Sequence, residues 1–246
     1  MIPAWLALID GLIAAFMVLV GIVGAHFYFV APFVGFQIFV LGFFLAILAV
    51  FVGIIAVFVT RKPPRRRVRP YALIGLVLGA VIALPVVLKI LSTSKYPAIN
   101  DITTDVNNPP EFVHAEQLPA NRGRNMAYDK AHYAEAQERG YGNVAPLQLK
   151  ADPGTVFTQV QAIASRMPDW EITYTDPKTD TLEGVATSSL FHFQDDFVIL
   201  VRSADGGGSL VEMRSKSRDG VGDFGVNYNR IQDFFTQLRL EAAATS

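Results

Sequence analysis

The sequence predicts an α+β protein in which three N-terminal transmembrane helices precede an antiparallel four-stranded sheet domain with flanking helices. Three observations support this fold class. Long apolar segments fill residues 1–91, a short basic loop interrupts them, and residues 151–246 show helical and strand periodicities in the order α-β-β-β-β-α. Helices packed on an antiparallel sheet are the α+β arrangement.

Charge is divided unequally between the two parts of the chain. Residues 1–91 hold seven of the 21 Lys and Arg and one acid, a net charge of +6. Residues 92–246 hold 14 bases and 21 acids, a net charge of −7, so the whole chain has −1. An acidic domain repels phosphates, so we expect no nucleic-acid partner. The chain has no cysteine, which excludes disulfides and thiolate catalysis.

Each apolar segment is long enough to cross a bilayer, which takes about 20 residues of helix. The segments are Ala4–Val30, Phe33–Val59 and Tyr71–Leu91. The loop Thr60–Pro70 carries six basic residues, and Lys and Arg mark the cytoplasmic side of a membrane. We therefore expect a bacterial inner-membrane protein with a cytoplasmic N-terminus, a cytoplasmic loop 60–70 and a periplasmic C-terminal domain.

Two features inside the spans suggest how the helices pack and function. Gly75, Gly79 and Ala83 recur every four residues, and this ridge of small residues favours packing among the three spans over a dimer face. Asp10 is an acid within the first span, where ionisable residues are candidates for a proton or ion pathway. Its position near the basic loop makes snorkelling to the surface the simpler interpretation.

Residues 92–150 are predicted to form an irregular strap or linker. Five prolines interrupt this segment, and only Met126–Arg139 has helical periodicity. A strap needs a surface on which to lie, either the C-terminal domain or a neighbouring membrane protein. Large side chains would supply the contacts. The candidates for partner contact are Ile102, Phe112, Tyr128, Tyr133 and Tyr141.

The C-terminal domain is predicted over residues 151–246. Asp152-Pro153 is typical of a helix start, and apolar residues at helical spacing follow it as far as Met167. The predicted strands are Trp170–Thr175, Leu182–Leu190, Phe197–Arg202 and Leu210–Ser215. The closing helix places Val226, Ile231, Phe234, Phe235 and Leu238 on one face.

The segment Met213–Ile231 concentrates the unusual polar side chains of the domain, and two interpretations of it stay open. Its arginines could bind an anion at the start of the last helix. They could instead pair with acids in an internal network, which the near balance of signs favours. The candidate residues are Asp195, Asp196, Arg202, Arg214, Ser215, Ser217, Arg218, Asp223, Asn227 and Arg230.

Known catalytic and metal-binding patterns are not found in the sequence. Gly220-Val-Gly222-Asp-Phe-Gly225 matches G-x-G-x-x-G, but the 21 residues after it are too few to complete a dinucleotide-binding unit. Asp195 and Asp196 are neighbours on a strand and point to opposite faces. The histidines of the domain fit no metal spacing. We therefore predict no catalytic residue, no metal and no cofactor.

Several separated motifs carry a family resemblance. The leading ones are Asn100-Asp101-Ile102-Thr103-Thr104-Asp105 and Pro109-Pro110-x-Phe112, followed by Trp170, Phe191-x-Phe193-x-Asp195-Asp196 and Arg202. The closing ones are Arg214-Ser215-x-Ser217-Arg218-x-Gly220, Asp223-x-Gly225-x-Asn227 and Arg230-Ile231. Together they resemble a bacterial domain-of-unknown-function family, number fourteen-ninety-nine, in a membrane-anchored member. The resemblance implies an envelope-exposed domain behind membrane helices, and it implies no activity.

These observations lead to one expected function and two alternatives. We expect an inner-membrane protein whose periplasmic domain is a binding or accessory module, with the lipid bilayer and another membrane protein or complex as partners. The first alternative is a periplasmic site for a small anionic ligand, or an enzyme site, around Arg214, Arg218, Asp195 and Asp223. The second is an ion-coupled role for Asp10.

Overall fold

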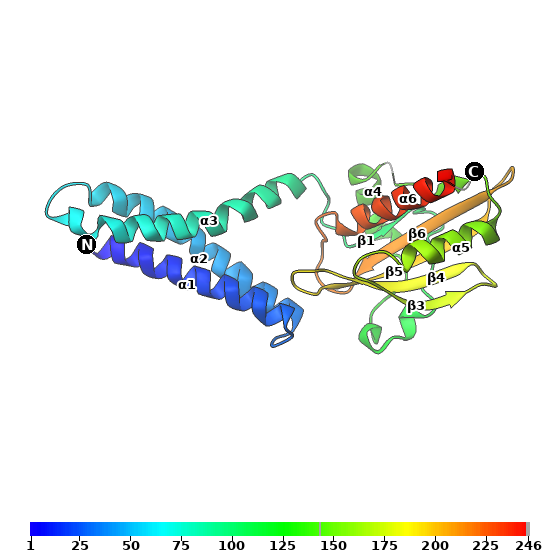
Figure 1. Ribbon diagram of the computed structural model, residues 1–246, viewed down its shortest axis with the longest axis horizontal. Coiled ribbons are helices and arrows are strands. Elements are labelled where there is room, and N and C mark those ends of the chain that lie inside the picture. The colour runs from blue at the N-terminus through cyan, green and yellow to red at the C-terminus, as the bar shows by residue number, and fades with distance from the viewer. Residues whose placement is uncertain (143, 245–246) are drawn as a thin grey trace. The chain divides into compact units, whose positions relative to one another are not determined.

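The computed structural model describes residues 1–142 and 144–244. The chain divides into two compact units (Figure 1). The first contains Met1–Thr93 together with Ser189–His192, and the second contains Ser94–Ser188 and Phe193–Ser246. The first unit is helical, and the second combines a sheet with helices, which is the α+β class that the sequence predicts.

The helical unit consists of α1 (Ile2–His26), α2 (Pro32–Val59) and α3 (Arg69–Thr93), with a 3₁₀ turn at Arg65–Val68 before α3. A proline in the first turn starts both α1 and α2, where a missing N–H costs no hydrogen bond. All three helices are long and apolar enough to cross a membrane. By this length and composition the chain is a membrane protein.

Glycines allow the three helices to approach closely. A Cβ atom added to Gly75 would collide with the carbonyl oxygen of Ala7 in α1. One added to Gly79 would lie 2.6 Å from the carbonyl oxygen of Ala46 in α2. The ridge of small residues on α3 therefore packs against helices of its own chain, as its spacing indicates.

The second unit contains six strands, three α-helices and two short 3₁₀ turns among its described residues. The elements in chain order are β1 (Asp101–Thr103), η2 (Ala115–Gln117), η3 (Pro119–Asn121), α4 (Lys130–Gly140), β2 (Leu147–Leu149), α5 (Pro153–Ala164), β3 (Trp170–Asp176), β4 (Thr181–Thr187), β5 (Gln194–Ser203), β6 (Ser209–Ser217) and α6 (Val226–Ala244).

The strand count corrects the prediction of four strands. The sheet is antiparallel and six-stranded in the order β1-β6-β5-β4-β3, with β2 also paired to β6. The two additional strands come from the segment expected to be an irregular strap or linker. Each has three residues, which is too short for alternation to be recognised in the sequence. Both strands pair with the edge of β6 that does not pair with β5.

Helix starts follow their capping residues. The Asp152 side chain accepts a hydrogen bond from the Thr155 N–H and begins α5, as predicted. Asp129 does the same for the His132 N–H, so α4 begins at Lys130 and not at Met126. Met126 is instead buried against the sheet.

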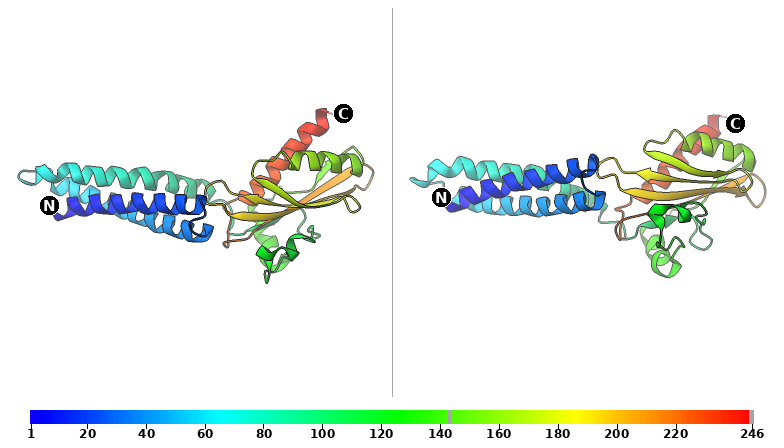
Figure 2. Two further views of the ribbon diagram at one scale, coloured as in Figure 1. Left: turned by 60° about the horizontal axis from the view of Figure 1, so that its bottom comes forward. Right: turned by 90° about the horizontal axis from the view of Figure 1, so that it is seen from below.

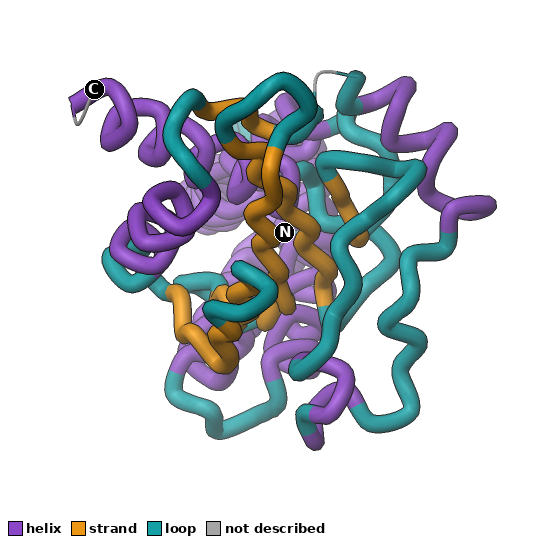
Figure 3. The backbone as a smooth tube through the Cα atoms, turned by 90° about the vertical axis from the view of Figure 1, so that its right-hand side faces the viewer, coloured by secondary structure: helices purple, strands orange, loops and turns teal. Residues whose placement is uncertain are grey.

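The two faces of the sheet are covered differently (Figures 2 and 3). Helices α5 and α6 cover one face, where Phe197, Ile199 and Met213 belong to the main hydrophobic core. Residues 104–129, which we call the covering segment, lie over the other face. Their apolar contacts there are few and centre on Phe112 and Met126 around Val198. Polar contacts hold most of this second interface.

Candidate functional site

The register of the sheet brings charged side chains together beneath the covering segment. Lys216 lies opposite Asp196 on one side and Asp101 on the other, and Arg214 lies opposite Val198. Residues that face each other across antiparallel strands project to the same face. The side chains of Asp101, Asp196 and Arg214 are at most 1% exposed. This is a buried layer of charge within a sheet.

Arg214 is the centre of the first cluster. Its Nε and Nη2 donate to the two carboxylate oxygens of Asp101 at 2.8 and 2.7 Å, and Nη2 also donates to the Met126 carbonyl at 2.9 Å. The guanidinium lies 4.9 Å from the ring centroid of Phe112 and 5.5 Å from that of Tyr128. Planar, bidentate pairing of this kind is specific to arginine.

Lys216 completes this first cluster. Its Nζ donates to Asp101 Oδ2 at 2.8 Å and lies 5.6 Å from the Tyr133 ring centroid. Asp101 therefore pairs with two cations at once. Burial raises the pKa of both Tyr128 and Tyr133 above the usual value, and the carboxylate of Asp101 adds to this effect. Both phenols stay neutral at physiological pH.

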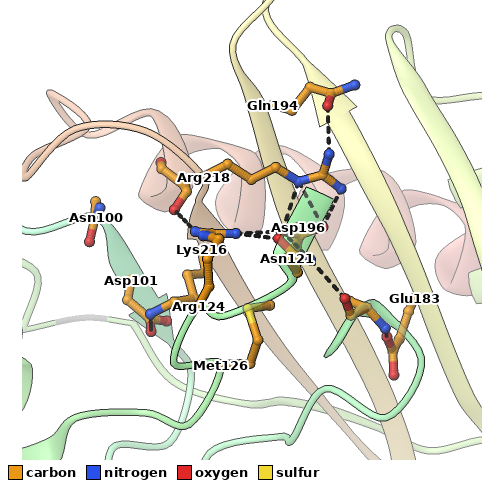
Figure 4. A network of polar contacts seen from close by, with 12 residues as sticks. Asn100, Asp101, Asn121, Arg124, Met126, Glu183, Gln194, Asp196, Lys216 and Arg218 are labelled. Atoms are coloured by element: carbon orange, nitrogen blue, oxygen red, sulfur yellow. Dashed lines mark hydrogen bonds and ion pairs between the residues drawn. The ribbon is translucent and has the colours of Figure 1, made fainter. Parts of the chain in front are cut away.

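Asp196 is the centre of the second cluster (Figure 4). Arg218 donates to both of its oxygens, with Nη2 2.6 Å from Oδ1 and Nε 3.0 Å from Oδ2. Asn121 Nδ2 donates to Oδ2 at 3.0 Å, and Arg124 Nη1 lies 3.3 Å from the same oxygen. Arg124 also donates to the Ser217 carbonyl at 2.7 Å. Asn121 and Arg124 belong to the covering segment, so this cluster fastens that segment to β5 and β6.

Glu183 on β4 fastens the covering segment at a third point. Its carboxylate accepts the backbone N–H groups of Val113 at 2.6 Å, of Ala115 at 2.6 Å and of His114 at 3.0 Å. These are orphan donors at the start of the η2 turn, and a carboxylate stabilises such donors. The Glu183 side chain is fully buried.

A fourth cluster lies on the opposite face of the sheet, beneath α6. Arg230 Nη2 donates to Asp195 Oδ2 at 2.6 Å, and Nη1 donates to Ser215 Oγ at 2.8 Å. Ser215 in turn donates to Asn227 Oδ1 at 2.7 Å, and Asn227 Nδ2 lies 2.9 Å from Ser217 Oγ. Because Asp195 and Asp196 face opposite sides of the sheet, each serves a different cluster.

Asp223 starts α6 by accepting the N–H groups of Gly225 at 2.9 Å and Asn227 at 2.7 Å. Burial raises the pKa of Asp223, and these two hydrogen bonds oppose the rise.

Near the start of β6, Arg202 of β5 forms a bidentate pair with the buried Glu212, with Nε 3.0 Å from Oε2 and Nη2 2.6 Å from Oε1. The Arg202 side chain is 45% exposed.

The chemistry of this arrangement is that of a self-satisfied network. Each of its six cations lies within 4 Å of a carboxylate, and the six carboxylates are bound by these cations or by backbone N–H groups. The cations are Arg124, Arg202, Arg214, Lys216, Arg218 and Arg230, and the carboxylates are Asp101, Glu183, Asp195, Asp196, Glu212 and Asp223. The charges balance over the network as a whole, although Asp101 and Asp196 each face two cations while Glu183 and Asp223 bind backbone N–H groups. Within the described ranges, no group of three potential ligands could hold a metal ion.

All ten predicted polar residues belong to these clusters, but important members were missed. Six further network residues were not predicted from the sequence: Asp101, Asn121, Arg124, Glu183, Glu212 and Lys216. Arg214 and Asp101 are 113 residues apart, and no sequence spacing connects them. A signal did exist for Glu183 and Glu212, because each is an acid inside a predicted strand, Leu182–Leu190 or Leu210–Ser215.

The five side chains proposed for partner contact lie within their own unit. Ile102 and Tyr141 are buried in the main core, and Phe112 is buried against Arg214. Tyr128 and Tyr133 are half-buried beside the Arg214 and Lys216 cations. Two surfaces were considered for the strap, the domain itself and a neighbouring protein. The structure places these five residues on the domain itself, so they are not free side chains for contact with a partner.

Asp10 lies in α1 and is half-buried. Its carboxylate makes no hydrogen bond or ion pair with any residue that the structure describes. Among the described residues, none of the basic side chains in the loop 60–70 forms an ion pair with Asp10. The geometry gives no support to a relay through the described residues.

The fold and the network define a membrane protein with an α+β domain whose sheet and covering elements are held together by buried ion pairs. Residues 101–238 match the family model described as Protein of unknown function (DUF1499). This match covers more than half of the chain, and the chain belongs to that family. A search of the curated proteins finds no match to it.

Proposed function

We propose that the protein is a bacterial inner-membrane protein whose α+β domain is periplasmic and serves as a binding or accessory module of a membrane complex. The observation that supports this proposal is the engagement of the charged groups. A catalytic or anion-binding site needs side chains free to meet a substrate, whereas the six cations here are committed to carboxylates. The network holds a rigid scaffold, as an interaction module requires.

The orientation is tested first. The segment 60–70, which connects α2 to α3 and includes η1, carries six basic residues, and the positive-inside rule predicts that it is cytoplasmic. Alkaline phosphatase, which is active only in the periplasm, is fused at Ser246 or at Arg66. We expect an active fusion at Ser246 and an inactive one at Arg66. The opposite pattern would reverse the orientation and place the domain in the cytoplasm.

The membrane complex is tested by size. Membranes are extracted with a mild detergent, and the apparent mass of the chain is compared with that of the purified chain in the same detergent. A subunit of a complex should migrate as a larger particle in the fresh extract. A chain truncated after Thr93, which retains the helices but lacks the α+β domain, should lose the larger particle.

Equal sizes for the extract and the purified chain would reject the complex. A larger particle that persists without the domain would assign the contact to the helices and reject the domain as the module. For the alternative, anion-binding function, the same purified chain is titrated with phosphate and carboxylate ligands. Saturable binding that is lost in Arg218→Gln would favour that alternative.

A further inference from the structure

Three apolar side chains project from the loop that connects β6 to α6 and from the first residue of that helix. Val221, Phe224 and Val226 are 84%, 56% and 47% exposed. They lie within Gly220–Val226, which we call the glycine loop. Exposed single apolar residues are common, but three within six residues form a local patch.

The glycine loop is fixed in place and holds this patch in one conformation. Asn100 Nδ2 donates to the Gly220 carbonyl at 2.7 Å, and the Asp223 N–H donates to the Ile99 carbonyl at 3.2 Å. The buried Asp223 carboxylate accepts two backbone N–H groups. Phe224 has φ of +53°, a conformation that bulky residues rarely adopt. The loop therefore presents Phe224 outward at a cost in backbone conformation.

The glycine loop is bound to the chain that leaves the last membrane helix. A Cβ atom on Gly225 would lie 2.6 Å from the Tyr96 ring, and one on Gly222 would lie 3.1 Å from Ala98 Cα. Helix α3 ends at Thr93. Three residues of extended chain reach only about 10 Å, so Tyr96 cannot lie farther than this from Thr93.

The end of α3 lies near the edge of the hydrocarbon layer. Its apolar part, residues 71–91, is about 31 Å long at 1.5 Å per residue, which matches a hydrocarbon core of about 30 Å. The polar interfacial layer beyond it is roughly 5–8 Å thick on each side. The covalent connection keeps Tyr96 within about 13 Å of the end of this apolar part, which is close enough for side chains of an attached patch to reach the layer.

We propose that the glycine loop is a membrane-contact element that inserts Val221 and Phe224, with Val226 beside them, into the interfacial layer of the bilayer. Aromatic and branched apolar residues favour this layer. The chemistry of the contact is apolar and not electrostatic, because residues 92–246 carry a net charge of −7. The contact should therefore form on zwitterionic lipid and persist at high salt.

The test uses the full chain reconstituted in vesicles of phosphatidylcholine. The natural sequence has no cysteine, so Val221→Cys and Phe224→Cys each provide one labelling site for an environment-sensitive NBD fluorophore. The control is Asp205→Cys in the exposed turn between β5 and β6. This turn is separated from the glycine loop by the length of β6, nine residues or about 30 Å.

We expect blue-shifted emission and quenching by doxyl-labelled lipids at positions 221 and 224, and neither at 205. The quenching should be unchanged in 1 M salt. Equal quenching at all three positions, or none at 221 and 224, would overturn the proposal. Quenching or a blue shift that disappears as the lipid-to-protein ratio is raised would also overturn it, since that result assigns the patch to a second copy of the chain. Val221 is so exposed that its substitution tests the contact even if Phe224→Cys fails to fold.

Discussion

The change Arg214→Ala should lower the free energy of unfolding of the α+β domain by about 3–5 kcal/mol, the usual cost of breaking a buried ion pair from one side. The substitution leaves Asp101 buried with Lys216 as its remaining cationic partner and removes the donor to the Met126 carbonyl. It also empties the space between Phe112 and Tyr128. Denaturant unfolding of the detergent-purified chain, followed by tyrosine and tryptophan fluorescence, measures this loss.

The matched control for Arg214→Ala is Arg139→Ala. Arg139 also pairs with a carboxylate, that of Glu135, but their side chains are 73% and 81% exposed. An exposed pair of this kind contributes at most about 0.5 kcal/mol. If Arg214→Ala unfolded like the control and the chain lost binding of an anionic ligand, the residue would belong to a ligand site and not to a structural network.

The change Glu183→Gln should release the covering segment at one point and cost about 2–4 kcal/mol. The carboxylate accepts the N–H groups of Val113, His114 and Ala115 with both oxygens. A glutamine amide offers one oxygen and places an NH₂ donor against the remaining N–H groups. Hydrogen exchange at residues 113–115 should accelerate more than exchange in β5.

Glu116→Gln is the control for this change, because Glu116 lies in the same η2 turn and is exposed. It removes the same charge without removing an acceptor for the backbone, so exchange at 113–115 should stay close to that of the natural chain. Acceleration of equal size in both variants would show that charge alone, and not the hydrogen bonds of Glu183, governs the segment.

The sequence predicted the elements whose formation depends on interactions between residues close together in the chain. The three spans, the capped start of α5 and most of the apolar face of α6 follow from composition, capping and helical spacing. Val226 was wrongly expected on that face, because it is the first residue of α6 and is exposed. β1 and β2 were missed because a three-residue strand exists only through its pairing with β6. The start of α4 was misplaced for a different, local reason: the Asp129 cap sets it at Lys130, although helical spacing extends back to Met126.

The candidate site was predictable in part of its residues, but six of its members and its pairing were not. The segment from Met213 to Ile231 contained the right arginines, and the balance of charge favoured an internal network. The partners of Arg214 and Arg218 lie on other strands, and Asp101 comes from a segment that was expected to be irregular. Which acid meets which base depends on strand register, and register is a property of the folded sheet.

The short strands β1 and β2 close one border of the sheet against further growth. β1 covers β6 at residues 214–216 and β2 covers it at residues 209–211. Between them, Thr104 exchanges hydrogen bonds with the backbone of Met213. The opposite border, β3, has an irregular register between Ile172 and Tyr174. A foreign strand would therefore meet one border that is already paired and another with an irregular register, and such borders protect a protein from edge-to-edge aggregation.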